Sequence, residues 1–560
     1  MKKKMSAVLA LSLAAAMMLG ACGGSAPATN NNASTGKTST AATASTPAAD
    51  EKQTLDETEA WMTPTELPLT DEKVTITCFT TQDSNLTNLV DTLADTPMFQ
   101  ELEKRTNVHI DFNMPAVGNE ASAYNLMIAS GELPDLIKNS GALGTQNYPD
   151  GLDAAVEDGY FLDLTDLAKD YAPHYIHALK DYGQYDKNVE LSAYTKGGRM
   201  VGIYQIMKQP QGHWAGWYVR EDWLKELGMD IPVTYDDWEA VLTAFKDQKG
   251  CSAPLLLGNT AYDGLYNYWS QGFGVTSGFH QEGGKLVYGP AQEGWKEYVT
   301  LMHDWYQKGL IDPDFMSAGW IPDQSMITTD KAGAYFGIYT QIAMLEAAAQ
   351  DQNALITAAP LPRKNAGDQL HLDNAIVLAG HMTVSAKTKY PEICVKLMDY
   401  LFSEEGALLA NFGIEGDTFE YVDGKPLFTE KITKNPEYSF AQAMAYYCMP
   451  GARCVWQDWS RELGAVPEKD VKCYDIWQTG LDNANSIPDV NNFDMTVEDR
   501  AEYAKIMTDV KSIVDERTVQ FITGVLPLDQ YDQYLADINA CGLDRAIELA
   551  QAAYEAFLAR

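Results

Sequence analysis

Segments with the residue pattern of β-strands alternate with segments that have the pattern of amphipathic helices along most of the chain. Between residues 74 and 137 this order predicts parallel strands joined by right-handed crossovers. The series has strands at 74–79, 108–112 and 134–137 and helices at 98–105 and around Tyr124, Met127 and Ile128. We therefore expect an α/β fold.

A second series of the same kind, again with parallel strands expected, and a helical C-terminus follow. Strands are expected at 217–219, 255–257, 334–337 and 376–379, and then a Pro-initiated helix that buries Ile393, Leu397, Tyr400 and Leu401. Helical spacing recurs at Tyr503, Ile506, Met507, Val510, Ile513 and Val514 and at Tyr531, Tyr534, Leu535 and Ile538, before Gly542. A body of roughly 500 residues exceeds what one core holds. Two α/β lobes with a C-terminal helical layer are the expected result.

The N-terminus has the parts of a secretory signal. Lys2, Lys3 and Lys4 are followed by an apolar run at 8–19, which is shorter than the roughly 20 residues of a membrane-spanning helix. Leu19-Gly20-Ala21-Cys22 then resembles a bacterial lipobox, which implies removal of residues 1–21 and a lipid on Cys22. The alternative is an ordinary secretory peptide with a chance cysteine.

The segment that follows the lipobox has the composition of a flexible linker. Residues 22–55 consist almost entirely of Gly, Ser, Ala, Thr, Asn and Pro. Such a segment cannot bury enough apolar surface to offset its ordering entropy, so we expect a disordered tether. No later segment resembles a membrane span, and a membrane contact is expected through the lipid anchor only.

Charge and cysteine usage exclude several classes of function. With 78 acidic and 41 basic residues, the formal net charge of −37 argues against nucleic-acid binding and against lying flat on an anionic membrane. The cysteines beyond Cys22 are 78, 251, 394, 448, 454, 473 and 541. Their number is odd and no Cys-x-x-Cys pair occurs, so neither a disulfide framework nor a zinc site is indicated. A pair between Cys448 and Cys454 stays open.

Several stretches resemble family 1 extracellular solute-binding proteins, in particular the large Gram-positive lipoprotein branch related to alginate-oligosaccharide-binding proteins. The matching pieces are Ala129-Ser130-Gly131-Glu132-Leu133-Pro134-Asp135-Leu136-Ile137, Val219-Arg220-Glu221-Asp222-Trp223-Leu224-Lys225-Glu226-Leu227-Gly228, Gly309-Leu310-Ile311-Asp312-Pro313-Asp314-Phe315, Gly413-Ile414-Glu415-Gly416, Tyr421-Val422-Asp423-Gly424-Lys425-Pro426 and Phe521-Ile522-Thr523-Gly524. They occur in the family's order and extend over nearly the whole mature chain.

This resemblance implies a two-lobed, periplasmic-binding-protein-like (type II) fold whose chain crosses between the lobes about three times. By analogy, lobe 1 comprises 56–205 and 378–445, and lobe 2 comprises 206–377 and 446–560. The implied function is capture of a carbohydrate by hinge closure and delivery to the permease subunits of an ABC importer. A monomer without a cofactor is expected, held at the outer face of the cytoplasmic membrane, with ATP hydrolysis left to other subunits.

The chain departs from its relatives at a stretch where they often carry an Asp-x-Asn-x-Asn-Gly calcium loop. Asp247-Gln248-Lys249-Gly250-Cys251 stands there, with one carboxylate and a lysine. Calcium takes six to eight oxygen ligands. We therefore expect no structural calcium at this point.

Aromatic residues outside helical patterns are the candidates for sugar binding, because sugar rings stack on flat aromatic faces and their hydroxyl groups bind polar side chains. Trp223, Trp238, Trp295 and Trp305 fall at helical spacing and are assigned to packing. The expected stacking platforms are Trp456, Trp269 and Trp217, with Trp214, Trp459 and Tyr339 as further aromatic candidates. Hydroxyl contacts are assigned to Arg453, Asp458, Gln271, Gln82 and Glu415. For each residue the alternative is a packing role.

Motifs of catalysis are missing from the sequence. It has no Gly-x-Ser-x-Gly elbow, no Gly-x-x-x-x-Gly-Lys-Ser/Thr loop and no His-Glu-x-x-His. The pair His174 and His177 is expected on a solvated loop. We predict a binding protein rather than an enzyme; the alternatives are a glycoside hydrolase and a binding protein for a peptide or another non-sugar solute.

Overall fold

The computed structural model describes most of the body of the chain, and Leu55–Arg560 form one compact unit. The described residues are 60–81, 83–116, 118–139, 147–149, 151–186, 188–209, 215–258, 267–318, 323–372, 379–450, 454–490, 493 and 495–559. The predicted signal segment, Cys22 and the tether lie outside them.

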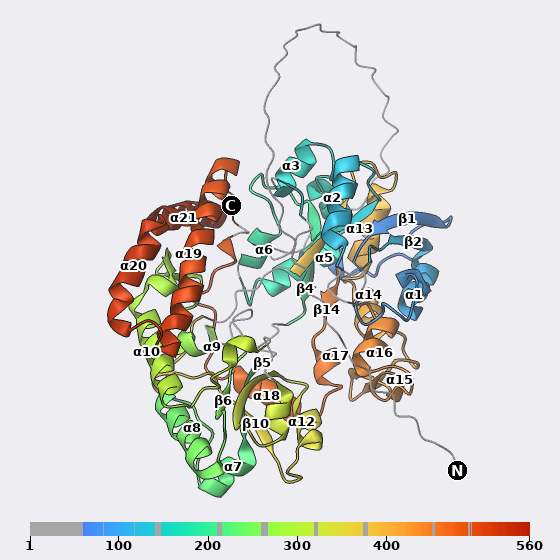
Figure 1. Ribbon diagram of the computed structural model, residues 1–560. Helices are drawn as coiled ribbons and strands as arrows, with labels where there is room; N and C mark the ends of the chain where they lie inside the picture. The colour runs from blue at the N-terminus through green and yellow to red at the C-terminus, as the bar shows by residue number, and fades with distance from the viewer. Residues whose placement is uncertain are drawn as a thin grey trace, which may run out of the picture. The chain divides into compact units, whose positions relative to one another are not determined.

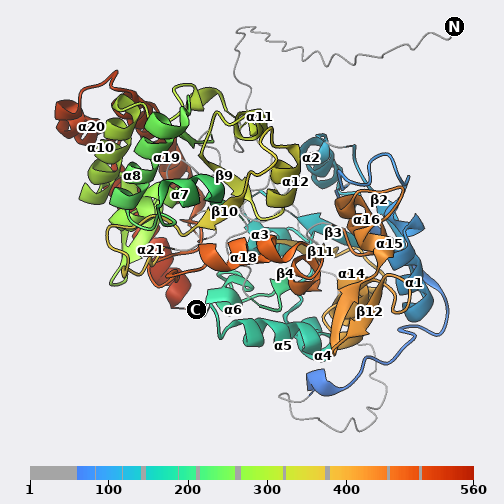
Figure 2. The same cartoon turned by 90° about the horizontal axis from the view of Figure 1, so that it is seen from below.

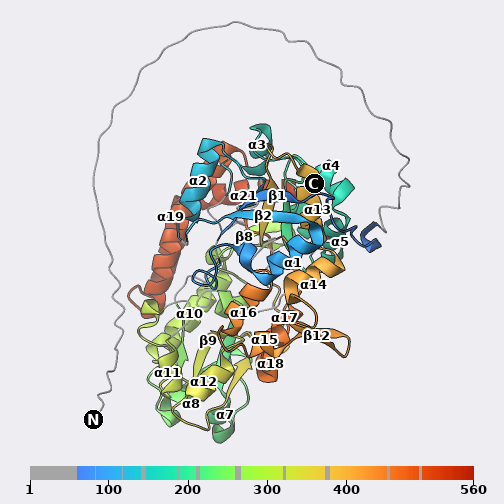
Figure 3. The ribbon, with the colours of Figure 1, turned by 90° about the vertical axis from the view of Figure 1, so that its right-hand side faces the viewer.

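A six-stranded sheet forms the centre of the first lobe (Figure 1). Its order is β14 (Trp456–Gln457), β4 (Gly202–Met207), β11 (Ala379–Val384), β3 (Leu136–Asn139), β1 (Val74–Phe79) and β2 (Val108–Asn113). Strand β1 runs parallel to β2 and β3, as the sequence predicts, and Figure 3 shows β1 beside β2. Strand β11 runs antiparallel to both β3 and β4 because the chain returns to this sheet from the second lobe.

A four-stranded sheet forms the centre of the second lobe. Its order is β10 (Ile356–Ala359), β5 (Ala215–Arg220), β9 (Ala334–Ile338) and β6 (Leu255–Leu256). Strands β6 and β9 are parallel, but β5 is antiparallel to β9 and β10, so the parallel arrangement predicted for this series is wrong at β5. The chain enters β5 soon after β4 of the other sheet, and β5 therefore starts at the edge where β9 and β10 end.

Helices and two hairpins surround the sheets (Figures 1 and 2). The hairpins are β7 (Phe279–Glu282) with β8 (Lys285–Tyr288), and β12 (Phe419–Val422) with β13 (Lys425–Phe428). The helices before residue 250 are α1 (Pro97–Thr106), α2 (Glu120–Ser130), α3 (Gly151–Glu157), α4 (Thr165–Tyr171), α5 (Pro173–Tyr182), α6 (Asn188–Ser192), α7 (Glu221–Leu227) and α8 (Tyr235–Lys249). The later ones are α9 (Asn267–Ser270), α10 (Glu293–Gln307), α11 (Gln324–Thr328), α12 (Ile342–Ala348), α13 (Pro391–Tyr400), α14 (Glu404–Phe412), α15 (Glu430–Thr433), α16 (Phe440–Tyr447), α17 (Ser460–Leu463), α18 (Glu468–Trp477), α19 (Val497–Thr523), α20 (Tyr531–Ala540) and α21 (Leu543–Leu558).

Each sheet has its own hydrophobic core. The core of the first lobe gathers side chains from β1, β4, β11, α1, α5 and α13. The core of the second lobe contains the four tryptophans assigned to packing, which are at most 5% exposed: Trp223, Trp238, Trp295 and Trp305. Two separate cores confirm the predicted two-lobed α/β fold.

The predicted C-terminal helical layer is present. Helix α19 packs against α10, and α20 and α21 pack against α19 (the red helices in Figure 1). Gly524 ends α19 with a φ of 78°, a left-handed conformation that glycine adopts without steric cost. Helix α21 also contacts β8, so this layer belongs to the second lobe. None of the helices in the described part of the chain combines the length and hydropathy that a bilayer crossing requires.

Three local expectations need correction or comment. The loop predicted for His174 and His177 is wrong, because Pro173 starts helix α5 and both side chains lie on it. Cys448 and Cys454, whose pairing was open, are buried free thiols. Strand β14 lies beyond the expected third crossing at 445 and yet pairs with β4 of the first lobe. The lobe limits themselves stay a prediction.

Candidate ligand-binding site

The ends of β4 and β14 bring together polar and aromatic side chains. The two strands are parallel, and the Lys208 amide donates to the Gln457 carbonyl over 2.8 Å. Residues that follow β4 therefore meet residues that follow β14, which include the predicted site residues Asp458 and Trp459. Ligands of α/β sheets bind outside such strand ends.

Trp456 is the one predicted stacking platform in the described chain that keeps part of its side chain exposed. The rings of His177 and Trp456 meet in a T-shaped arrangement, with centroids 6.0 Å apart and ring planes at 86°. The Lys208 ammonium lies 4.9 Å from its ring centroid, a cation–π contact. The indole is thus held from two sides.

Asp458 is fixed beside this tryptophan. Its carboxylate accepts hydrogen bonds from Gln209 Nε2 over 3.2 Å and from the Ser460 amide over 2.9 Å. Lys208 Nζ lies 3.9 Å from the other oxygen. The Asp458 amide donates to Asn411 Oδ1 over 2.9 Å, which ties the backbone to α14. The result is a positioned carboxylate next to an aromatic ring, the pairing that a sugar hydroxyl and its ring face require.

Tyr339 and Trp459 come together in one hydrophobic cluster beside the second sheet. Tyr339 follows β9, and its ring lies 6.0 Å from the ring of Trp459, which precedes α17. The Tyr339 hydroxyl donates to Glu462 Oε2 over 2.8 Å. Burial raises the pKa of Tyr339, so the phenol keeps its proton for this bond. Both rings are only 6% exposed and are packing residues of this cluster.

Trp217 and Trp269 are packing residues in this structure. Both are fully buried, with ring centroids 4.8 Å apart, and Trp238 and Trp305 contact the ring of Trp269. A ring enclosed on every side has no face for a sugar, so the expectation that these two are stacking platforms finds no support. The sequence does not reveal the burial of Trp217. Strand β5 is buried on both faces, so it lacks the alternation of apolar and polar residues that would show which side chains face the core.

Of the remaining predicted contacts, Gln271 and Glu415 lie in the described part of the chain. Gln271 is 5% exposed and its Oε1 has no hydrogen-bond partner among the described residues. Glu415 lies exposed in the loop after α14, bridged to Phe419. Gln82, Trp214 and Arg453 lie outside the described residues, as does most of the strand expected at 376–379.

Sequence reasoning missed several residues of the cluster. Lys208 and Gln209 were not singled out, because strand β4 was not predicted, and Glu462 of α17 carries no sequence signal that separates it from the other acidic residues. Its sequence Gly202-Ile203-Tyr204-Gln205-Ile206-Met207 does carry a signal, because isoleucine and tyrosine are enriched in strands. Had β4 been recognised, the polar pair that follows it would have entered the site.

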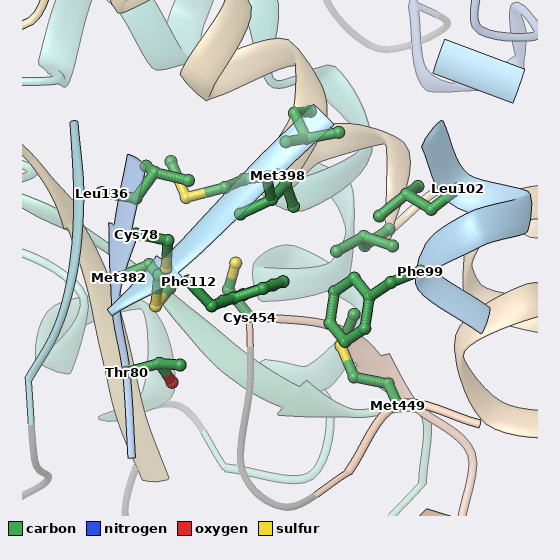
Figure 4. Close-up of a pocket in the computed structure, with 13 residues that line it drawn as sticks. Cys78, Thr80, Phe99, Leu102, Phe112, Leu136, Met382, Met398, Met449 and Cys454 are labelled. Atoms are coloured by element: carbon green, nitrogen blue, oxygen red, sulfur yellow. The ribbon is translucent and has the colours of Figure 1, made fainter. Parts of the chain in front are cut away.

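An apolar cavity of about 50 Å³ lies inside the first lobe, between the sheet and α1 and α13 (Figure 4). Its walls are hydrophobic and sulfur-containing side chains, among them Cys78, Met382, Met398 and Cys454, and Thr80 supplies the one hydroxyl. A carbohydrate needs several polar partners, so this cavity is a packing feature and not the sugar site.

The described residues contain no group of three or more His, Cys, Asp or Glu side chains that could hold a metal ion. Residues 247–249, where relatives often have a calcium loop, form the last turn of α8, which Gly250 ends with a φ of 73°. The expected absence of calcium stays a prediction.

Two α/β lobes joined by crossing segments, with an aromatic and acidic cluster at the strand ends, define the fold class of type II solute-binding proteins. The chain matches the model of the bacterial extracellular solute-binding protein family over residues 87–408, and it belongs to that family. The family consists of binding proteins and not of enzymes.

Three curated relatives match the chain over most of its length. Lipoprotein LipO of Bacillus subtilis is 24% identical over 477 residues, which cover 81% of this chain and 85% of LipO. The fructooligosaccharide ABC transporter substrate-binding protein FusA of Streptococcus pneumoniae is 24% identical, with 82% and 87% covered. The polygalacturonan/rhamnogalacturonan-binding protein YtcQ of B. subtilis is 23% identical, with 81% and 87% covered.

Solved structures share the fold. The crystal structure of the alginate-binding protein AlgQ2 without calcium ion superposes with a TM-score of 0.65 at 23% identity and covers 87% of this chain and 99% of AlgQ2. This likeness supports the type II arrangement of the two lobes.

Proposed function

We propose that this protein captures an oligosaccharide outside the cell and hands it unaltered to the permease of an ABC importer. The observation that carries the proposal is the similarity over four fifths of the chain to FusA and YtcQ, whose names give a fructooligosaccharide and polygalacturonan or rhamnogalacturonan as ligands. The cluster of Trp456, Asp458 and Lys208 supports it, because it offers a ring face, a carboxylate and an ammonium at the strand ends.

Closure of the two lobes is the proposed means of capture. A ligand that contacts both lobes binds the closed state more tightly and shifts the open–closed equilibrium by that difference. The chain leaves β14 of the first sheet and enters the segment of Trp459 and Glu462, which contacts Tyr339 beside the second sheet, and this passage is suited to a hinge. The closed form is what the permease would recognise.

The proposed location is the outer face of the cytoplasmic membrane, with a lipid on Cys22 as the only anchor. The support is the lipobox-like Leu19-Gly20-Ala21-Cys22, the linker composition of residues 22–55 and a relative named as a lipoprotein. Metabolic labelling with a clickable fatty acid tests this: the wild-type chain should carry label, and a Cys22→Ala variant should carry none.

A thermal-shift screen over fructo-oligosaccharides, galacturonate oligomers, alginate oligomers and short peptides tests the ligand class. One oligosaccharide series should raise the melting temperature, and Trp456→Ala should weaken its binding by about tenfold, as expected for loss of an aromatic contact of about 1.4 kcal/mol. Trp456→Phe should retain most of the affinity. A shift with peptides alone, or shortened sugar products, would overturn the proposal.

A further inference from the structure

An aromatic stack joins the first described residues of the body to helix α5. Trp61 lies in a short 3-10 helix, η1 (Ala60–Met62), and its ring lies on the ring of His177 with centroids 3.6 Å apart and planes 5° apart. Burial lowers the pKa of His177, which favours the neutral ring at neutral pH. Figures 2 and 3 show this dark blue segment beside α4 and α5.

The segment after η1 is held to the first lobe at further points. Leu67 and Leu69 pack against the core of that lobe, and the Leu69 amide donates to the Thr106 carbonyl over 3.0 Å. The Val74 amide donates to the Asn107 carbonyl over 3.1 Å at the start of β1. Trp61 therefore lies at one end of a segment that is packed and hydrogen-bonded to the first lobe, and these contacts hold its indole on the His177 ring.

His177 carries this contact on to Trp456. Its ring stacks on Trp61 and also forms a T-shaped pair with the Trp456 indole, with 6.0 Å between centroids. Strand β14, which holds Trp456, is two residues long and lies at the edge of the sheet. The backbone of this strand is bonded to β4, Leu401 and Asn411, whereas the orientation of the Trp456 ring depends on its side-chain contacts with His177 and Lys208.

We infer that Trp61, acting through His177, is a positioning residue that holds Trp456 in the orientation used for ligand. This inference rests on the proposed function for its consequence, the affinity for a sugar, but the brace itself exists without ligand. The same contact makes the segment that follows the expected tether part of the binding machinery rather than a plain linker.

Hydrogen exchange of the ligand-free protein, read by mass spectrometry, tests the brace directly. Trp61→Ala should speed exchange of the amides of residues 455–458 by about two- to tenfold, the range that one aromatic pair supports. Peptides of β1 and β2 should exchange as in the wild type, which separates a local effect from a loss of global stability. Trp61→Phe should restore protection, and Met62→Ala, whose side chain is 62% exposed on the same turn, should change nothing.

Affinity for the tightest-binding sugar of the thermal-shift panel is the second readout. Trp61→Ala should weaken it by about two- to tenfold and Trp61→Phe by less than twofold. Unchanged exchange at residues 455–458 in Trp61→Ala would refute the brace, whatever the sugar does. Loss of protection with unchanged affinity would refute the positioning role. Unchanged affinity in Trp456→Ala would instead refute the proposed site.

Discussion

Asp470 is a buried carboxyl group whose protonation should control the stability of the second lobe. It lies in the first turn of α18 and is 0% exposed. Burial raises the pKa of Asp470 from 3.8 to about 6, and the neighbouring charge of Lys469 and the Ile342 amide oppose this only in part.

The sign of the effect follows from the raised pKa. Folding favours the protonated acid, so the contribution of Asp470 to stability is fully present below pH 3.8 and is lost as the pH rises through about 6. Each pKa unit corresponds to about 1.4 kcal/mol, so ionisation of this group should destabilise the folded state by up to about 3 kcal/mol at pH 7.5.

Replacement of Asp470 by asparagine removes this titration and keeps the shape of the side chain. Urea unfolding at pH 7.5 should show Asp470→Asn more stable than the wild type by about 2–3 kcal/mol, and unfolding at pH 4 should show a difference below about 0.5 kcal/mol. Asp475→Asn, at an exposed position of the same helix, is the matched control and should show no such pH dependence. Equal destabilisation by Asp470→Asn at both pH values would refute the reasoning.

Three further substitutions test other parts of the structure by urea unfolding. Thr80 is 1% exposed at the cavity, and its hydroxyl has no hydrogen-bond partner among the described residues. Thr80→Val should therefore stabilise the folded state by about 1 kcal/mol, and a loss of stability would show that the hydroxyl is bonded. Arg220 is 1% exposed and forms ion pairs with Asp222 over 2.7 Å and with Asp330. Arg220→Met leaves these carboxylates without their cation, so it should lower the free energy of unfolding by about 3–5 kcal/mol. A neutral result would contradict the stabilising role of these ion pairs. Gly480 has a φ of 71°, and an added Cβ would lie 2.2 Å from Arg363 Nη1. Gly480→Ala should therefore lower the free energy of unfolding by about 2 kcal/mol or more. Gly367 has open space around it, so the control Gly367→Ala should be neutral.

The fold was largely predictable because its strands and helices carry strong local patterns. The expected strand at 74–79 matches β1, and the helical spacing of Tyr503, Val510 and Val514 matches α19. The direction of β5 in the second lobe was not predictable. The chain enters β5 from the other sheet, and the residue pattern of a strand contains no information on the side from which the chain arrives. Strand β14 has only two residues, which is too short for any periodicity to appear.

The site was predictable only in part, because burial of an aromatic residue depends on partners far away in the sequence. Trp217 and Trp456 both lie near strand ends and look alike in sequence. The first is enclosed by Trp238, Trp269 and Phe336, while the second lies on an edge strand and stays partly exposed. Likewise, His174 was expected in solvent, but Asp399 of α13 lies 2.6 Å from its ring and both are buried.

Isothermal titration calorimetry with the oligosaccharide series that gives the largest thermal shift, followed by mass spectrometry of the recovered sugar, tests the central claim most directly. We expect saturable binding of one sugar per chain and recovery of the sugar at its original mass. Absence of heat with every oligosaccharide of the panel, or recovery of shorter sugars, would contradict the account.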